Sequence, residues 1–191
     1  MYNCERNPQL NDLDKILFTE KQIQERIQAL GIEINNHYQN QEFVLISVVN
    51  GAIPFTADLM REIHSPVYFD SIRASSYNHS TNSNGSPILL DRLNIGIANK
   101  DVLIVDDILD TGLTLSCIIN EIVQQKPKSI KTCVLLNKIA RRQIDLTADF
   151  VGFDIPDEFV VGYGLDFAEK YRTLPCVGIL NPDFLNPPSW S

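Results

Sequence analysis

Residues 101–115 read DVLIVDDILDTGLTL, and this stretch determines the fold expected for the chain. Its first part, Val102 to Val105, is short, β-branched and apolar on both faces, as in a strand buried in a parallel sheet. From Thr114 onward, apolar residues recur at helical spacing, so the chain is predicted to pass from strand to helix through a tight turn. Because a helix N-terminus carries unpaired N–H groups and a partial positive charge, an anion is expected at that turn.

The polar residues around this turn fall into two groups with different chemistry. Thr111 and Thr114 offer hydroxyl donors, and the glycine between them permits close approach of the backbone, which suits a phosphate. Asp106 and Asp107 would repel a phosphate, but they can accept hydrogen bonds from sugar hydroxyls or hold a divalent cation. A stretch that only caps a helix would explain one of the three acids Asp106, Asp107 and Asp110, but not all of them. The pattern therefore indicates a site for a ribose 5-phosphate.

A receiver domain of two-component signalling also places an acidic pair after its first strand, where the pair binds magnesium. In receivers that pair lies near the N-terminus, whereas about half of this chain precedes it. The receiver pair is also not followed by an Asp-Thr-Gly loop. Both differences weigh against a receiver domain.

Alternating strands and helices are expected along the rest of the chain. Thr19 and Gln22 form a capping-box pattern at the start of an amphipathic helix, and Pro54 suits the first turn of a second helix. Strands are expected at residues 43–49, 67–72, 101–105, 130–136 and 150–153. This order implies a parallel sheet with helices on both faces, whose ligands collect at the carboxyl ends of the strands. The polar residues expected at those ends are Asn50, Asp106 and Lys138.

Five segments together resemble the hypoxanthine-guanine phosphoribosyltransferases, a branch of the type I phosphoribosyltransferases. Residues 101–115 are similar to the family's phosphoribosyl pyrophosphate signature. Four further segments follow the family's order, namely VVNGAIPFTADL (48–59), IRASSY (72–77), LLNK (135–138) and GFDIPDEFVVGYGLDFAEKYR (152–172). Because the five segments span most of residues 15–180, the resemblance is specific.

The resemblance implies an α/β fold, with a parallel twisted sheet flanked by helices and a small hood that covers a purine. It implies magnesium-dependent transfer of the 5-phosphoribosyl group from phosphoribosyl pyrophosphate to N9 of hypoxanthine or guanine. A xanthine-preferring relative and a non-catalytic regulator that senses phosphoribosyl pyrophosphate remain alternatives. Residues 1–191 are expected to form a single domain, with residues 181–191 as a loosely attached tail.

The resemblance also implies roles for individual residues. The expected contacts of the phosphoribosyl group are Asp106, Asp107, Asp110, Thr111, Gly112, Leu113 and Thr114, with Asp110 the catalytic residue near purine N7. The expected purine contacts are Lys138, Phe159, Val160 and Asp166. The expected pyrophosphate contacts are Gly51 and Arg172. The expected lid residues are Ser76 and Tyr77, in a loop expected to be mobile without ligand. The expected magnesium ligands are Asp106, Asp107 and Asp166.

Two of these residues could also have simpler structural roles. Asp110 could cap the turn as well as act in catalysis, and Lys138 could be a surface lysine whose charged head reaches water. Two positions depart from the family pattern. Asp106 stands where Glu is common, and Asn50 stands where many relatives carry Lys or Arg, so pyrophosphate binding there relies more on backbone N–H groups. The sequence leaves open whether the Asn50-Gly51 peptide bond is cis.

Composition agrees with a globular enzyme and excludes some other classes. The formal net charge of −8 argues against general nucleic-acid binding, which needs a basic surface. No apolar run approaches the roughly 20 residues of a membrane span, and the N-terminus lacks the apolar core of a signal peptide, so a cytoplasmic location is expected. The four cysteines have no paired spacing, so neither a zinc site nor a disulfide framework is indicated. The family habit implies a homodimer or homotetramer.

Overall fold

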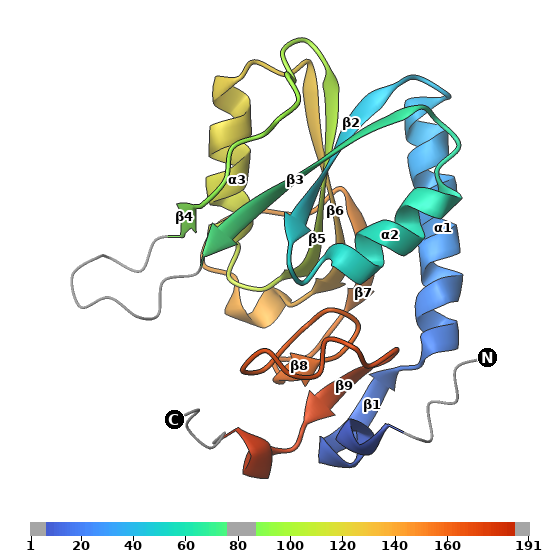
Figure 1. Ribbon diagram of the computed structural model, residues 1–191, viewed down its shortest axis with the longest axis vertical. Coiled ribbons are helices and arrows are strands. Elements are labelled where there is room, and N and C mark those ends of the chain that lie inside the picture. The colour runs from blue at the N-terminus through green and yellow to red at the C-terminus, as the bar shows by residue number, and fades with distance from the viewer. Residues whose placement is uncertain (1–6, 76–86, 186–191) are drawn as a thin grey trace.

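The structure is a computed structural model that describes residues 7–75 and 87–185. Its centre is a six-stranded sheet with the strand order β4-β3-β2-β5-β6-β7 (Figure 1). Five of these strands are parallel: β2 (Phe43–Val49), β3 (Val67–Ser75), β5 (Asp101–Leu109), β6 (Ser129–Asn137) and β7 (Phe150–Asp154). The short β4 (Ile88–Leu89) pairs antiparallel with β3 at one edge. The expected parallel sheet is confirmed.

Helices cover both faces of this sheet. Helices α1 (Glu20–Tyr38) and α2 (Ile53–Glu62) lie on one face, and α3 (Leu113–Gln124) lies on the other (Figure 1). The predicted capping box is present, because Thr19 Oγ1 accepts from Gln22 N and the Gln22 side chain accepts from Thr19 N. Pro54 lies in the first turn of α2, as expected.

The core is divided between the two faces by the alternation of side chains along each strand. Leu45 and Leu103 pack with α1 and α2, whereas their neighbours Ile46 and Ile104 pack with α3. All four side chains are fully buried. Strands that are apolar on both faces need helices on both faces, because each face would otherwise expose apolar surface to water.

A second, smaller sheet forms what we call the hood, which consists of β1 (Leu13–Phe18), β8 (Val160–Val161) and β9 (Val177–Leu180). These strands are antiparallel in the order β1-β9-β8, so the N-terminal strand pairs with the last strand of the chain. Short 3-10 helices lie at residues Pro8–Asp12, Ile139–Arg141 and Pro182–Phe184. The hood lies at the end of the main sheet where α1 begins (Figure 1). A hood was expected from the family resemblance, but its three strands were not predicted.

Several predicted strands are longer in the structure than in the sequence pattern. The strand expected to end at Val105 continues to Leu109, so Asp106 and Asp107 lie within β5 and not after it. The expectation that Asp106 follows the end of a strand is therefore wrong. Asn50 and Lys138 do follow directly after β2 and β6.

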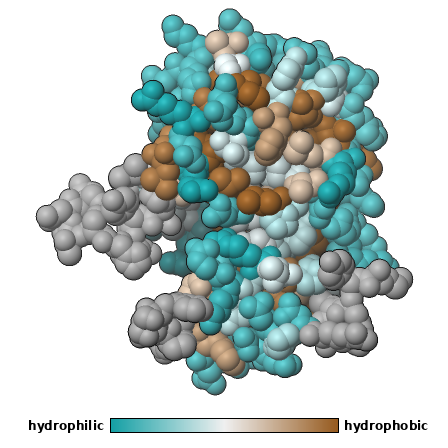
Figure 2. All heavy atoms as spheres, in the orientation of Figure 1, coloured by the Kyte–Doolittle hydropathy of each residue, from teal (hydrophilic) through white to brown (hydrophobic). Residues whose placement is uncertain are grey.

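The surface of the described residues is mixed. In the view of Figure 2, hydrophobic residues gather over the six-stranded sheet, whereas the residues over the hood are mostly hydrophilic. Within residues 7–75 and 87–185, none of the helices combines the length and the apolar character that crossing a membrane requires.

Candidate active site

A cavity of about 770 Å³ opens over the carboxyl ends of β2 and β5 and the N-terminus of α3. It collects most of the residues expected to contact the phosphoribosyl group and pyrophosphate. The predicted residues that line it are Gly51, Asp106, Asp107, Asp110, Thr111, Gly112, Leu113, Thr114, Asp166 and Arg172. Segments that lie far apart in the sequence therefore meet at one site, where the topology of a parallel sheet places ligands.

The turn between β5 and α3 has the geometry of an anion site. Gly112 caps α3 with a φ of 87°, a left-handed conformation that glycine adopts without strain. Thr111 Oγ1 accepts a hydrogen bond from Leu113 N at 3.4 Å, which holds the loop over the helix end. Leu113 N is the first amide of α3 and is used in this contact, whereas the next amides, those of Thr114 and Leu115, have no acceptor within the helix and can bind a phosphate.

Asp106, which is buried, and Asp107, which is partly buried, form an acidic pair that lines this cavity. Asp106 is 6% exposed, and its Oδ1 accepts from Asp107 N at 2.9 Å. Burial, together with the charge of Asp107, raises the pKa of Asp106 well above its ordinary value. Burial also raises the pKa of Asp107, although hydrogen bonds and the charge of Arg172 oppose this rise. Two acids that are costly to ionise together are a natural site for a cation, which would lower both pKa values.

The loop after β2 packs directly against this acidic pair. A side chain at Gly51 would overlap Asp107 Oδ2, so only glycine lets the loop backbone lie this close to the carboxylate. A side chain at Gly164, just after the hood strand β8, would likewise overlap the carbonyl oxygen of Gly51. The loop contains a cis peptide bond, which joins Val49 to Asn50 and not Asn50 to Gly51.

Lys138 is buried and close to Asp110. It is 4% exposed, and its Nζ donates to the carbonyl oxygen of Glu158 at 2.8 Å. Its Nζ lies 4.0 Å from Asp110 Oδ2 and 3.9 Å from Asp157 Oδ1. The interpretation of Lys138 as a surface lysine with its head in water is therefore wrong. Burying an ammonium group is costly unless acids and acceptors surround it, as they do here.

Asp110 has one oxygen without a partner. Its Oδ2 faces Lys138 and, at 3.6 Å, Arg141 Nη1. Its Oδ1 is buried and accepts no hydrogen bond within the described part of the chain. A buried acceptor without a donor is unfavourable, so this atom indicates a place where a ligand supplies a proton.

Of the expected purine contacts, Asp166 lines the cavity, whereas Lys138, Phe159 and Val160 do not. Phe159 is 41% exposed, and its ring meets that of Phe167 edge to face at 5.4 Å. Val160 is buried in β8, the edge strand of the hood sheet, so one side of its backbone has no strand beside it among the described residues. Exposed aromatic surface next to an unpaired strand edge is suited to a flat heteroaromatic ligand.

Arg172 holds the segment from Gly164 to Arg172 together. Its Nη2 lies 2.8 Å from Asp166 Oδ1 and 3.0 Å from Glu169 Oε2, and its Nη1 donates to Gly164 O at 2.8 Å. Asp166 is thus paired with Arg172. Considering only the residues that the structure describes, no three acidic, histidine or cysteine side chains form a metal cluster, so the three expected magnesium ligands do not converge.

Three arginines near the site were not singled out from the sequence. Arg142 donates to Leu109 O at 3.2 Å and to Asn137 Oδ1 at 2.6 Å, which ties the ends of β5 and β6 together. Arg73 and Arg141 line the cavity. The adjacent basic pair that follows Lys138 was a visible signal for Arg141 and Arg142, whereas nothing in the sequence marked Arg73. The lid residues Ser76 and Tyr77 lie outside the described residues.

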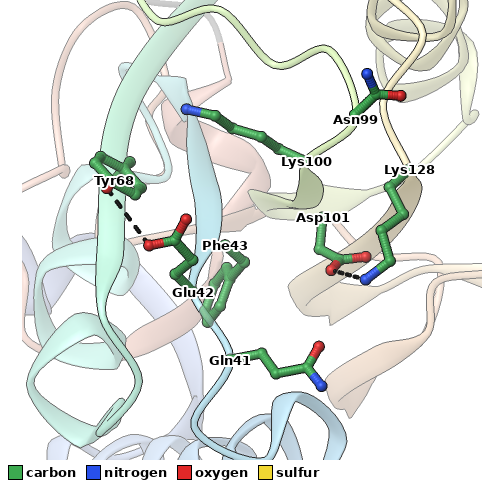
Figure 3. Close-up of a pocket in the computed structure, with 8 residues that line it drawn as sticks. All are labelled: Gln41, Glu42, Phe43, Tyr68, Asn99, Lys100, Asp101 and Lys128. Carbon is green, nitrogen blue, oxygen red and sulfur yellow. Dashed lines mark hydrogen bonds and ion pairs between the residues drawn. The ribbon is translucent and has the colours of Figure 1, made fainter.

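A second cavity, of about 330 Å³, lies at the opposite end of the sheet, where β2 and β5 begin (Figure 3). Its charges are largely paired within the protein. Lys128 Nζ lies 2.7 Å from Asp101 Oδ2, and Lys100 Nζ lies 4.7 Å from the centre of the Tyr68 ring. Because its charges are paired and it lies at the amino ends of the strands, this cavity is less suited to bind a ligand than the first cavity.

Comparisons with known proteins agree with this geometry. Residues 15–168 match the phosphoribosyl transferase domain family. The chain is 44% identical over 172 residues to a hypoxanthine-guanine phosphoribosyltransferase of Bacillus subtilis, which covers 90% of this chain and 96% of that protein.

Solved structures give the same result. A hypoxanthine-guanine phosphoribosyltransferase of Bacillus anthracis superposes with a TM-score of 0.84 at 44% identity, covering 88% of this chain and 99% of that one. A hypoxanthine phosphoribosyltransferase of Staphylococcus aureus superposes with a TM-score of 0.89 at 40% identity, covering 95% and 98%. The chain therefore belongs to the phosphoribosyltransferase family and, within it, to the hypoxanthine-guanine phosphoribosyltransferases.

Proposed function

We propose that this protein salvages purines by transferring the 5-phosphoribosyl group of phosphoribosyl pyrophosphate to N9 of hypoxanthine or guanine. The products are the corresponding nucleotide and pyrophosphate. The single observation that carries the proposal is the meeting of Asp106, Asp107, Asp110 and the turn at residues 111–114 around one cavity. This arrangement offers separate partners for a sugar, a phosphate and a base.

The charges that develop in the reaction determine what the site must supply. As the bond from C1 to the pyrophosphate oxygen breaks, the ribose becomes cationic and the leaving group gains negative charge. The turn amides would hold the 5-phosphate, which does not change during the reaction. The acidic pair would accept hydrogen bonds from the ribose hydroxyls and favour the positive charge of the ring.

Asp110 would act on the base. Its Oδ1 is buried and without a donor among the described residues, so it is suited to receive a proton from purine N7 while N9 forms the new bond. Lys138 would donate to the oxygen at purine position 6. An ammonium group can donate but not accept, so this contact favours 6-oxopurines over adenine, whose position 6 carries an amino group.

The hood would hold the plane of the base. Phe159 would stack on the purine, and the backbone of Val160 would face the edge that distinguishes guanine from hypoxanthine. Support comes from the exposure of the Phe159 ring and from the position of Val160 in an edge strand. Gly51 and Arg172 line the cavity beside Asp107, which supports their role in pyrophosphate binding. Asp166 would act beside them through its pair with Arg172.

The donors present fit magnesium. This ion commonly takes one or two carboxylates and completes its shell with water and substrate phosphates, so a closed cage of protein ligands is not needed. Asp106 and Asp107 would hold it, directly or through water, and bound magnesium would neutralise the charge of the leaving pyrophosphate. The raised pKa values of the pair agree with a site that is completed by a cation.

The remaining parts of the proposal concern the whole protein. We expect residues 1–191 to act as a single domain in the cytoplasm, without binding nucleic acid, as a homodimer or homotetramer. The net charge of −8 supports the absence of nucleic-acid binding, and the half-exposed Tyr68 and Phe69 on β3 offer apolar surface for a subunit contact. Light scattering after size-exclusion chromatography would measure the assembly.

A base panel tests the reaction. Purified protein, phosphoribosyl pyrophosphate and magnesium would be mixed with hypoxanthine, guanine, xanthine or adenine, and pyrophosphate release would be measured. We expect turnover with hypoxanthine and guanine, none with adenine, and loss of turnover when a chelator removes the metal. Faster turnover with xanthine would favour the xanthine-preferring alternative. No release with any base would contradict an enzymatic function and favour a sensing role.

A further inference from the structure

The cavity has more acids than bases, although its proposed substrate is a polyanion. The acidic side chains that line it are Asp106, Asp107, Asp110, Asp166 and Glu169. The basic side chains that line it are Arg73, Arg141 and Arg172. A pyrophosphate group entering such a site needs cations, so it matters which of the three guanidinium groups are still available.

Two of these arginines are already occupied. Arg172 forms ion pairs with Asp166 and Glu169 and donates to a backbone carbonyl, at distances between 2.8 and 3.0 Å. Arg141 lies 3.6 Å from Asp110 Oδ2 and 3.9 Å from Asp157 Oδ1, which places it on the side of the proposed base. Neither can turn fully to a new anion without losing these partners.

Arg73 differs from both. Its side chain is exposed and makes no ion pair or hydrogen bond with any residue in the ranges 7–75 and 87–185. Its backbone is nevertheless held firmly, because β3 pairs in parallel with β2 on one side and Leu90 N donates to Arg73 O at 2.8 Å on the other. A charge near a fixed strand end, without a partner among the described residues, is well placed to bind a ligand.

The register of the sheet decides which part of the site Arg73 serves. Arg73 is paired with Val49, the last residue of β2, so it lies next to the loop that carries Asn50 and Gly51. That loop touches Asp107 and has no charged residue of its own between Val49 and Pro54. Arg73 therefore supplies the positive charge that this corner of the cavity otherwise lacks.

We propose that Arg73 is a binding residue for the pyrophosphate group, holding it from the β3 side of the loop at residues 50–51. The inference rests on the proposed function and adds a residue that the sequence did not mark. A guanidinium group makes paired, charge-assisted hydrogen bonds to phosphate oxygens, so it is suited to bind pyrophosphate. Arg73 would act on phosphoribosyl pyrophosphate and on free pyrophosphate, but not on a nucleoside monophosphate.

The test compares Arg73→Gln with Arg73→Lys and with a matched control, Arg92→Gln. Arg92 is also exposed and has no partner among the described residues, but it does not line the cavity. KM for phosphoribosyl pyrophosphate would be measured with hypoxanthine, and the Kd values of pyrophosphate and GMP would be measured by calorimetry in magnesium. Thermal unfolding would confirm that each variant is folded.

We expect Arg73→Gln to weaken the binding of phosphoribosyl pyrophosphate and pyrophosphate by about tenfold, the order expected for one charge-assisted contact. GMP binding should change by less than about twofold, and Arg73→Lys should recover part of the loss, because it keeps the charge but not the paired hydrogen bonds. Equal effects of Arg73→Gln and Arg92→Gln, or no recovery in Arg73→Lys, would overturn the proposal. If the unaltered protein lacked turnover, the proposed function would fail, whereas the pyrophosphate titrations would still decide the role of Arg73.

Discussion

Single atoms decide much of the chemistry at the residue scale. In Asp110, Oδ2 faces two cations and Oδ1 faces none, so the two oxygens of one carboxylate have different tasks. The charge of Lys138 keeps Oδ2 in place, which leaves Oδ1 for the ligand. The burial of Lys138 is itself tolerable only because Asp110, Asp157 and a backbone carbonyl surround its ammonium group.

Replacing Asp110 tests this division. Asp110→Asn keeps the shape but replaces one oxygen by an amide that donates, so proton transfer from N7 should fail. We expect kcat to fall by about 10²-fold or more while GMP still binds, measured by steady-state kinetics and calorimetry. Asp145→Asn, at an exposed aspartate outside the cavity, is the control. A near-normal kcat in Asp110→Asn would remove this residue from catalysis.

The contact between Gly51 and Asp107 allows a second prediction. A methyl group at Gly51 would overlap Asp107 Oδ2, so Gly51→Ala must displace either the loop or the carboxylate. Because small displacements of catalytic groups are costly, we expect kcat/KM for phosphoribosyl pyrophosphate to fall by at least about tenfold. Gly96→Ala is a matched control, since a methyl group there would meet nothing within 4 Å. Similar kinetics for both variants would show that the close contact is not required.

At the scale of elements, strand length is the main difference between expectation and structure. β5 and β3 each extend past their last apolar run because neighbouring strands continue the ladder of hydrogen bonds beyond it. The neighbour is the parallel β6 for β5, and the parallel β2 followed by the antiparallel β4 for β3. Asp106 is therefore placed by pairing with Val134 and not by a turn. The sequence marks apolar runs, but the pairing of strands decides where a strand ends.

Asp70 shows how a single buried acid joins two elements. It lies on β3 and accepts hydrogen bonds from the backbone N–H groups of Asn94 and Ile95, in the segment before β5. Burial opposes its ionisation, but the donors from Ile95, Ser71 and Asn94 outweigh burial and lower its pKa below the ordinary 3.8. The charged form is therefore the one that stabilises the fold.

The pH dependence of stability tests this contact. Since the pKa of Asp70 is lower in the folded state, its contribution is complete above the ordinary value and is lost as the pH falls through the folded-state value. We expect Asp70→Asn to lower the free energy of unfolding by about 1–3 kcal/mol at pH 7, and by less below about pH 4. Denaturant unfolding from pH 7 to 3 measures this, with the exposed Asp14→Asn as control. If Asp70→Asn lowered the free energy of unfolding by the same amount from pH 7 to 3, the stabilising role of the charged form would be contradicted.

At the scale of the whole molecule, the site exists because two sheets are held in one arrangement. Besides the packing of hood residues in the core, one link is a hydrogen bond of 2.5 Å from Tyr163 Oη, next to the hood strand β8, to Asp58 Oδ2 on α2. Gln24 on α1 donates to the same oxygen, and Arg61 pairs with the other oxygen of Asp58. The same segment of chain continues to Gly164, which packs on Gly51. The hood and the loop after β2 are therefore positioned together.

Removing this link should loosen the hood. Tyr163→Phe deletes one buried hydrogen bond, so we expect a loss of about 1–2 kcal/mol in unfolding free energy and faster hydrogen exchange in residues 160–176. The exposed Tyr68, whose hydroxyl lies 3.5 Å from Glu42, provides Tyr68→Phe as a matched control. Unchanged exchange across the hood in Tyr163→Phe would show that apolar packing alone positions it.

The sequence by itself determined the parallel sheet, the helix with the capping box at Thr19, the helix that begins around Pro54 and the acid-rich turn. Apolar periodicity, capping residues, proline and glycine act over a few neighbouring positions. Only the tertiary structure decided the pairing of β1 with β9, the burial of Lys138 and the presence of Arg73 beside Val49. These features join residues that are distant along the chain. Their energies depend on which strands become neighbours, and no local pattern of residues records that choice.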